Sequence, residues 1–269
     1  MRICATCAVE YDEPLPAVCP ICADERQWVP ADGQRWADLA DLRAAGQRLT
    51  WTEREPGLVS ITAEPRVGIG QTAQLVITGG GSLLWDPPGY IDEQTVGRIR
   101  ERGPVLAVAA SHPHMFGVQI EWARSLDAPV LVCERDREWL GRNDNHVEFW
   151  GDARRIADGL VLYRVGGHFA GSAVALWDAG ADGRGLLLTG DTIFPNPDRR
   201  SVGFLRSYPN KIPLSGAVVE RIAAQLEQLR FERIIGNFGN AIDHDGPAVL
   251  RFSADRHIRW VRGDFDNLT

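Results

Sequence analysis

Three short segments far apart in the chain share one arrangement, in which an apolar run of strand type leads into a histidine or an aspartate. They are Ser111–His114, which reads Ser-His-Pro-His, Gly166–Ser172, which contains His168, and Leu188–Thr192, which contains Asp191. Three histidines and one aspartate at strand ends indicate a single metal site assembled from distant parts of the sequence. Imidazole and carboxylate are ligands that suit a divalent ion such as zinc.

The residues around each segment favour a shared site. His112 and His114 are two positions apart, so on an extended backbone both side chains point the same way. His168 follows two glycines, which let the backbone turn sharply and direct the ring. The carboxylate of Asp191 follows a strand of buried type, where it is costly unless it is paired or bound to a cation. Each motif alone is more often an ordinary loop or core feature, and the series of three carries the prediction.

Two Cys-x-x-Cys pairs lie close together near the N-terminus and predict a second metal site. Each pair presents two thiolates to one ion, and two pairs complete a tetrahedral sulfur site. A segment this short cannot bury a core of its own, so a metal is the expected source of its stability. The alternative interpretation is four unrelated thiols. The predicted ligands are Cys4, Cys7, Cys19 and Cys22.

The paired cysteines, with a proline after Cys19, also resemble the rubredoxin-like module of rubrerythrins. This resemblance allows iron as well as zinc, because four thiolates bind both. We expect residues 1–30 to form the cysteine module, a zinc ribbon or rubredoxin-like unit, and residues 31–269 to form the main domain. The fifth cysteine, Cys133, lies in an apolar strand pattern and is expected in the core.

Composition limits the classes of binding partner and the cellular compartment that we expect. The chain has 269 residues, a net charge of −7 and scattered basic residues, so no nucleic-acid footprint is visible. No apolar run is long enough to span a bilayer, and the N-terminus lacks the apolar core of a secretion signal. We expect a cytoplasmic protein that acts on a small molecule and binds neither nucleic acid nor membrane. The sequence leaves a homo-oligomer open.

Apolar periodicity predicts strands first and then alternating helices and strands, which indicates an α/β fold with layers. The segment Phe194–Pro213 shows no periodicity and is expected to be a long functional loop. Expected helices are 36–45, 91–102, 118–126, 217–229 and 247–261. Expected strands are 58–63, 74–78 and 82–85 as an antiparallel meander, then 105–109, 130–133, 160–165, the hairpin 173–177 with 185–189, and 231–235.

These motifs resemble the metallo-β-lactamase-fold superfamily, whose pattern is His-x-His-x-Asp-His, Gly-His-x-x-Gly-Ser, Gly-Asp and a late Gly-His. The resemblance covers about residues 57–245 and implies a four-layer αβ/βα sandwich with the metal at one edge, between two sheets. It also gives Asp86 a supporting role near the site. The matching residues are His112, His114, His168 with Gly171 and Ser172, and Gly190 with Asp191.

The chain departs from the family pattern at the second metal position. Phe116 and Gly117 stand where the family has Asp-His, and Asn237 or Asn240 stands where the late His is expected. His244 lies nearby but off the pattern. The resemblance therefore implies a mononuclear site, with zinc, iron or manganese as the ion.

The first functional hypothesis is a metal-dependent hydrolase of a small ester, thioester, lactone or phosphoester, which uses one metal-activated water. Asp191 is a ligand that can also hold the water, and Tyr208 is the candidate donor of a proton or hydrogen bond to the substrate. Two alternatives stay open. One is a mononuclear iron redox enzyme of the same fold, and the other is a non-catalytic metal-binding scaffold.

Overall fold

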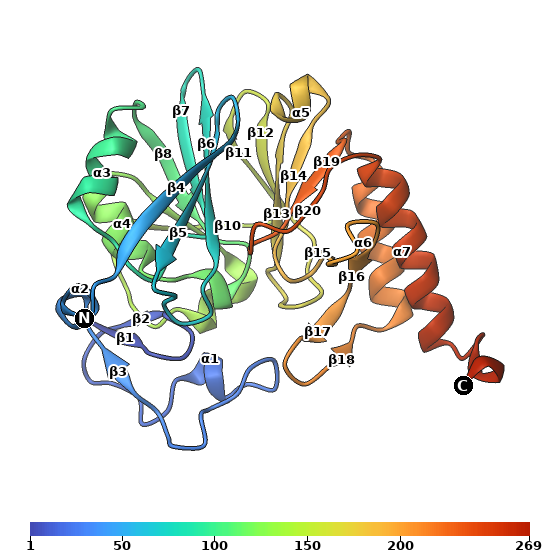
Figure 1. Cartoon of the computed structure of the whole chain (residues 1–269), viewed down its shortest axis with the longest axis horizontal. Helices are drawn as coiled ribbons and strands as arrows, with labels where there is room; N and C mark the ends of the chain where they lie inside the picture. Colours follow the sequence, from blue (N-terminus) through green and yellow to red (C-terminus); the bar gives the residue numbers. More distant parts are fainter.

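Two mixed β-sheets lie face to face in the computed structural model, which describes residues 1–269 (Figure 1). The first sheet has seven strands in the order β10-β9-β8-β7-β6-β5-β4. In chain order these strands are β4 Arg48–Glu55, β5 Leu58–Glu64, β6 Thr72–Thr78, β7 Gly81–Trp85, β8 Val105–Ala109, β9 Val130–Cys133 and β10 Val147–Trp150.

The second sheet has six strands in the order β11-β12-β13-β14-β19-β20. These strands are β11 Ala153–Ala157, β12 Leu160–Arg164, β13 Ala173–Trp177, β14 Leu186–Leu188, β19 Arg233–Ile235 and β20 Ala241–Ile242. The helices of the chain are α1 Pro20–Ala23, α2 Leu39–Ala44, α3 Glu93–Arg100, α4 Gln119–Leu126, α5 Gly180–Gly183, α6 Gly216–Leu226 and α7 Gly246–Val261, with short 3₁₀ turns at Pro113–Met115, Glu134–Trp139 and Asp266–Leu268.

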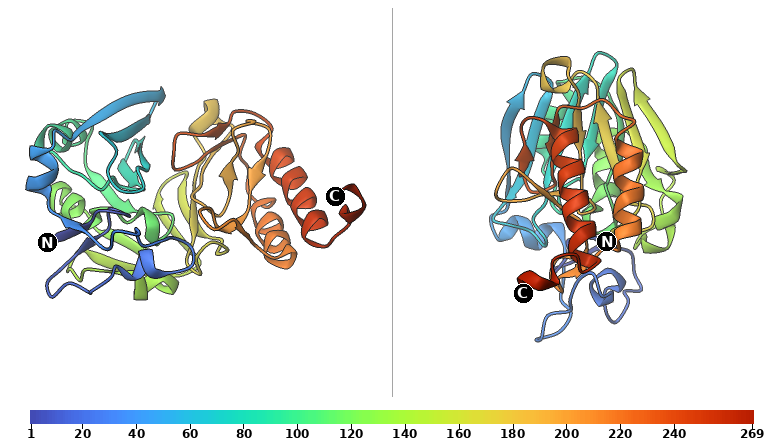
Figure 2. Two further views of the ribbon diagram at one scale, coloured as in Figure 1. Left: turned by 60° about the horizontal axis from the view of Figure 1, so that its bottom comes forward. Right: turned by 90° about the vertical axis from the view of Figure 1, so that its right-hand side faces the viewer.

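Three apolar clusters fill the spaces between these layers. One packs α3 and α4 against the first sheet, a second lies between the two sheets, and a third packs α6 and α7 against the second sheet. Figure 2 shows α6 and α7 side by side on that outer face. This arrangement confirms the predicted four-layer αβ/βα sandwich. No helix in it has both the length and the apolar character that crossing a membrane requires.

The predicted antiparallel meander is present as β5 to β7, and β4 extends it at the edge of the first sheet. The sheet then continues with parallel strands, because α3 connects β7 to β8 and α4 connects β8 to β9. Parallel neighbours need such crossovers. The strands β4, β10 and β11 are additions to the prediction. β4 reads Arg-Leu-Thr-Trp-Thr-Glu-Arg-Glu, and its many polar residues suit an edge strand.

The N-terminal residues form a small separate sheet in the order β2-β1-β3, with β1 Arg2–Cys4, β2 Glu10–Tyr11 and β3 Trp36–Ala37. The predicted helix 36–45 is therefore wrong at its start. Trp36 pairs with Cys4 across the sheet, and helix α2 begins only after Asp38, whose side chain accepts a hydrogen bond from the Asp41 amide. That N-cap fixes the start of the helix.

The predicted irregular loop Phe194–Pro213 contains two short hairpins. One pairs β15 Phe194–Pro195 with β16 Val202–Gly203, and the other pairs β17 Leu205–Ser207 with β18 Ile212–Pro213. Strands of two or three residues are too short to show a period in the sequence. The β17–β18 hairpin lies beside the loop that follows α1 (Figure 1), and the Asn210 side chain donates to the Glu25 carbonyl oxygen in that loop at 2.8 Å.

Candidate metal centre

The candidate ligands follow strands of both sheets. His112 and His114 follow β8 of the first sheet, and Asp191 follows β14 of the second. Asp86 follows β7, the parallel neighbour of β8, and Asn237 follows β19, the parallel neighbour of β14. Within each sheet the carboxyl ends of parallel neighbours share one edge, and the two sheets pack face to face, so residues far apart in sequence meet. His168 joins them from the loop between β12 and β13.

The four candidate ligands of the first site form one buried group. One ligand atom from each of His112, His114, His168 and Asp191 lies within 4.8 Å of the others. His168 Nε2 is 3.2 Å from His114 Nδ1, and Asp191 Oδ2 is 3.6 Å from His112 Nε2 and 3.7 Å from His168 Nε2. The predicted convergence of these residues is therefore confirmed.

Hydrogen bonds on the outer side of the rings direct ring nitrogens inward. Nδ1 of His168 lies 3.0 Å from the Leu205 carbonyl oxygen, which accepts its proton and leaves a lone pair on Nε2. Nδ1 of His112 lies 2.9 Å from the Ser111 hydroxyl. The buried Nε2 atom of His112 has no hydrogen-bond partner. This nitrogen faces a carboxylate and two other rings, and a bound cation would supply its missing partner.

The electrostatics of the group suit a cation. Burial lowers the pKa of His114 well below its ordinary value, and burial likewise lowers the pKa of His168 to about 4. Both rings are therefore neutral at pH 7, as metal ligation requires. Burial alone would raise the pKa of Asp191, but the surrounding rings of His112 and His168 hold it below its ordinary value. The site thus combines the Asp191 carboxylate with the neutral imidazoles of His114 and His168.

Asp86 holds the ligand segment instead of belonging to the group. Its Oδ1 accepts a hydrogen bond from the Ser111 amide at 2.6 Å, next to His112. Its backbone is left-handed at a φ of 54°, and the side chain is fully buried. Burial raises the pKa of Asp86 to about 7. This position agrees with the supporting role that the family resemblance implies.

The second metal position of the family is closed by backbone and by two other side chains. At Gly117, which has a φ of 52°, a Cβ atom would lie 2.3 Å from the Pro87 carbonyl oxygen. No histidine side chain fits there without moving the backbone. The Asn237 amide nitrogen donates to Asp191 Oδ1 at 2.9 Å and contacts the Met115 sulfur at 3.1 Å.

The structure separates the three candidates for the late position. Asn237 is buried and faces Asp191, whereas the Asn240 amide donates to the Pro195 carbonyl oxygen at 2.6 Å. His244 is 69% exposed and its Nδ1 lies 3.6 Å from a Glu232 carboxylate oxygen. Of the three candidates, Asn237 is therefore the one that faces the histidine group, and it holds the Asp191 carboxylate by a hydrogen bond.

Tyr208 lies at the edge of the group. Its hydroxyl donates to the Asp191 carbonyl oxygen at 2.9 Å, and its ring centroid is 6.1 Å from that of His168. Burial raises the pKa of Tyr208 well above its ordinary value, and the Asp191 charge adds to this effect. The phenol therefore keeps its proton. Its proposed role toward a substrate stays a prediction.

An arginine from the cysteine module reaches the histidine group, and nothing in the sequence pattern marks it. Arg26 Nη1 donates to the His168 carbonyl oxygen at 3.2 Å. Its guanidinium lies 3.7 Å from the centroid of the Phe169 ring, which packs against all three histidines. Asp24 pairs with the other side of the guanidinium. This buried arginine contact links the two candidate sites, and it depends on tertiary packing.

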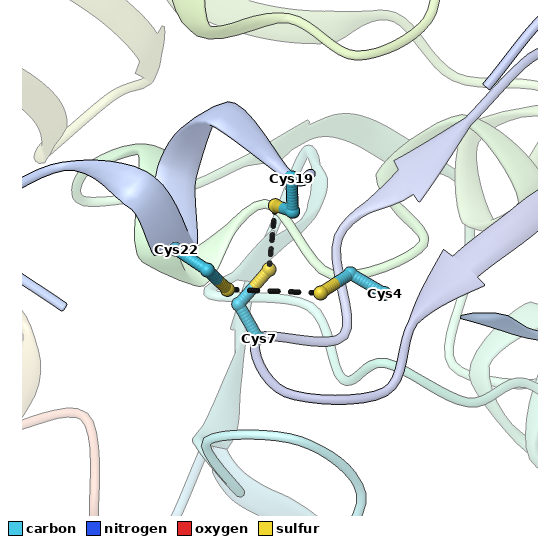
Figure 3. Close-up of side chains that lie close together, drawn as sticks. All are labelled: Cys4, Cys7, Cys19 and Cys22. Atoms are coloured by element: carbon cyan, nitrogen blue, oxygen red, sulfur yellow. Dashed lines mark hydrogen bonds between the residues drawn. The ribbon is translucent and has the colours of Figure 1, made fainter. Parts of the chain in front are cut away.

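The four N-terminal cysteines also converge (Figure 3), as predicted. The sulfurs of Cys4 and Cys22 are 3.6 Å apart and those of Cys7 and Cys19 are 3.7 Å apart, too far for disulfides. A tetrahedral zinc with bonds of about 2.3 Å places its sulfurs about 3.8 Å apart. The spacing therefore fits one tetrahedral ion. The Gln34 amide adds an N–H···S contact of 3.2 Å to Cys4.

Comparisons with known proteins agree with this geometry. The chain is 43% identical over 267 residues to the uncharacterized protein YmaE of Bacillus subtilis, and the match covers 97% of each chain. No protein-family model matches it.

Solved metallo-β-lactamases share the fold. VMB-1 is 14% identical with a TM-score of 0.60, over 80% of this chain and 98% of its own. FIM-1 from Pseudomonas aeruginosa, solved in a mono-zinc form, is 14% identical with a TM-score of 0.56, over 79% of this chain and 96% of its own. The enzyme from Pontibacter korlensis is 18% identical with a TM-score of 0.56, over 78% of this chain and 99% of its own.

Proposed function

Since the chain belongs to the family of the Bacillus subtilis protein YmaE and has the metallo-β-lactamase fold, we propose that it is a metal-dependent hydrolase with one catalytic ion. The proposed ligands are His112, His114, His168 and Asp191. The observation that carries the proposal is the convergence of four buried ligand atoms within 4.8 Å, at the wall of a cavity of about 290 Å³. Substrates of this class are small esters, thioesters, lactones or phosphoesters.

A divalent ion in this site supplies Lewis-acid polarisation of a scissile carbonyl or phosphoryl oxygen and lowers the pKa of a bound water to about 7. The residues of the chain do the rest. The three histidines offer ring nitrogens as ligands, with His114 and His168 neutral, and Asp191 supplies the negative charge. Asn237 fixes the Asp191 carboxylate by its hydrogen bond to Oδ1, so that Oδ2 faces the rings.

The reaction needs only one ion in this proposal. Gly117 leaves no room for a histidine, and the Met115 sulfur and the Asn237 amide fill the space beside Asp191. A two-metal clamp on the attacking and leaving oxygens is therefore not part of the mechanism. Tyr208, which borders the cavity and keeps its proton, is the proposed hydrogen-bond donor to the developing oxyanion.

The cysteine site is proposed to hold a structural zinc or iron. All four cysteines are buried, and the cluster to which they belong also contains residues of the first sheet and of α4. An ion at this position holds the loop that carries Arg26, and it takes no part in the reaction itself.

Metal content and hydrolysis test the proposal together. Protein purified without added metal is expected to hold two ions per chain, with one lost in His114→Ala and the other lost in Cys4→Ala. Metal-dependent hydrolysis of an ester and thioester panel should disappear in His114→Ala and persist in His244→Ala, which changes an exposed histidine outside the group.

Two results would reject hydrolysis at this metal site. One is hydrolysis that persists in His114→Ala, and the other is an ion content that this variant leaves unchanged. Iron in the histidine site together with absent hydrolysis would favour the mononuclear redox enzyme. An ion that supports no turnover at all would favour the binding scaffold.

A further inference from the structure

The cavity beside the histidine group is lined by several distant segments of the chain. Its volume is about 290 Å³, at the lower end of the range of about 300–1,000 Å³ for small-molecule pockets. His114 and Asp191 lie at one wall. The other lining residues are Arg26, Gln27 and Trp28 from the cysteine module, Arg66 and Ile69 from the loop after β5, and Phe194, Tyr208, Pro209 and Phe238.

The cysteine module contributes a fixed wall. Its loop after α1 is anchored on one side by Arg26, which donates to the His168 carbonyl oxygen, and on the other by the Asn210 amide, which donates to the Glu25 carbonyl oxygen. The next residue in the loop, Gln27, is buried. Trp28 is therefore presented to the cavity from a rigid support, although it is 50% exposed.

The lining is mostly apolar and partly uncovered. Trp28 is 50% exposed and Phe238 is 38% exposed, which is unusual for large aromatic side chains beside a polar centre. Phe194 packs against both Tyr208 and Phe238, with ring centroids 4.8 and 6.0 Å apart. Such a surface binds an apolar body of a ligand, since burial of that body removes exposed aromatic area from water.

The free charge of the cavity is positive, although the whole chain carries −7. Arg26 is paired with Asp24, and Asp191 belongs to the ligand group. Arg66 is exposed, and its one hydrogen bond runs from Nε to the Gly68 carbonyl oxygen at 3.0 Å. The two terminal nitrogens of Arg66 stay free, and a guanidinium fork of this kind matches a carboxylate.

We propose that this cavity selects substrates with an apolar body and one carboxylate, which Trp28 and Phe238 bind at the body and Arg66 binds at the charge. The inference rests on the proposed hydrolase for the identity of the reacting bond. The predicted binding preference itself does not depend on the proposed hydrolase activity. It gives the cysteine module a role in substrate choice beyond its own stability.

A matched substrate pair tests the preference in the metal-loaded enzyme. The 4-nitrophenyl half-ester of glutaric acid carries a carboxylate, and 4-nitrophenyl pentanoate has the same chain length without it. Wild type is expected to prefer the half-ester through a lower KM, by about tenfold, as one charge-assisted hydrogen bond allows. Arg66→Met should abolish the preference by raising the KM of the half-ester to that of the neutral ester. Arg43→Met, at an exposed arginine on α2, should behave as wild type.

Trp28→Ala should raise the KM of both esters, because it removes part of the apolar wall and leaves the charge in place. Equal kcat/KM values for the two esters in wild type, or a preference that survives Arg66→Met, would overturn the proposal.

Calorimetry with phenylacetate and phenylacetamide separates this inference from the proposed function. Tighter binding of phenylacetate should be lost in Arg66→Met and retained in His114→Ala. If it is instead lost in His114→Ala and retained in Arg66→Met, the anion binds the metal and the inference is wrong. A binding preference that needs Arg66, in a protein that hydrolyses no ester, would support the cavity and reject the hydrolase.

Discussion

At the scale of single residues, the main-chain conformation helps to decide how many ions the histidine group can hold. Gly117 follows Phe116 at the position of the family's Asp-His pair, and its φ of 52° suits glycine. The Pro87 carbonyl oxygen lies where a Cβ would be, only 2.3 Å away. Neighbouring backbone is less able to yield than a flexible side chain. The loss of the second position is therefore built into the packing.

We expect Gly117→Ala to lower the free energy of unfolding by more than about 2 kcal/mol, because it adds a backbone clash to the strain of a left-handed residue. Gly183→Ala is the matched control, since Gly183 has a φ of 77° with no atom within 4 Å of its added Cβ. Urea unfolding of both variants measures the difference. Equal losses would show that the approach of Pro87 costs nothing.

Asp136 gives a second prediction at this scale. It is buried, and its Oδ1 accepts a hydrogen bond from the Gly171 amide at 2.7 Å in the loop that carries His168. Burial raises the pKa of Asp136 from 3.8 to about 6. A raised pKa means that the folded state binds the proton more tightly, so the stability from this group is complete below pH 4 and lost as the pH rises through 6.

Asp136→Asn should remove this dependence. From pH 4 to pH 7, the free energy of unfolding of the variant is expected to gain about 2–3 kcal/mol relative to wild type. Urea unfolding at intervals of one pH unit gives both curves, and contributions from the other groups cancel in their difference. Parallel curves would mean that Asp136 titrates normally in the folded protein.

At the scale of elements, the short helix α1 and the loop after it connect the two candidate metal sites. Cys19 directly precedes this helix and Cys22 lies within it, and Arg26 lies three residues beyond its end, in contact with the His168 backbone and the Phe169 ring. An ion on the four thiolates fixes α1, and α1 in turn fixes Arg26. Contacts that orient metal ligands commonly change metal affinity by about 10–100-fold.

Arg26→Met keeps an unbranched apolar side chain and removes the guanidinium with its hydrogen bond to His168. We expect the affinity of the histidine site for zinc to fall about tenfold, the lower end for such outer contacts, while the cysteine site keeps its ion. Competition with a chelator measures the affinity. Arg35→Met, at an exposed arginine of the same module, is the control. Unchanged affinity in Arg26→Met would show that the two sites are independent.

At the scale of the whole molecule, the sequence is enough to predict the candidate ligands but not the contacts that surround them. Each ligand follows an apolar strand within a local motif, so His112, His168 and Asp191 could be recognised without coordinates. Arg26 could not, because its contacts span 142 residues and no local period reports them. Strand β4 was hidden in the same way, since its polar residues suit an edge strand and give no apolar run.

The packing of the cysteine module predicts how the chain unfolds. Ile3, Cys7 and Ile21 belong to the same apolar cluster as residues of β5, β6 and α4. Buried Glu10 adds polar contacts, since it accepts hydrogen bonds from the Ile120 amide at 2.6 Å and from Arg142 at 2.8 Å. The module therefore shares a core with the first sheet and should not melt alone.

Cys4→Ser, which removes a ligand of the cysteine ion, should lower the Tm of the whole chain by about 10 °C or more in one transition. A structural zinc contributes on the order of 10 kcal/mol in small modules, and each kcal/mol shifts the Tm of a chain this size by about 2–4 °C. Calorimetry records the transition, and Cys133→Ala controls for loss of a buried cysteine elsewhere. An early separate transition in Cys4→Ser, with the main Tm unchanged, would show that the module and the first sheet do not share one cooperative core.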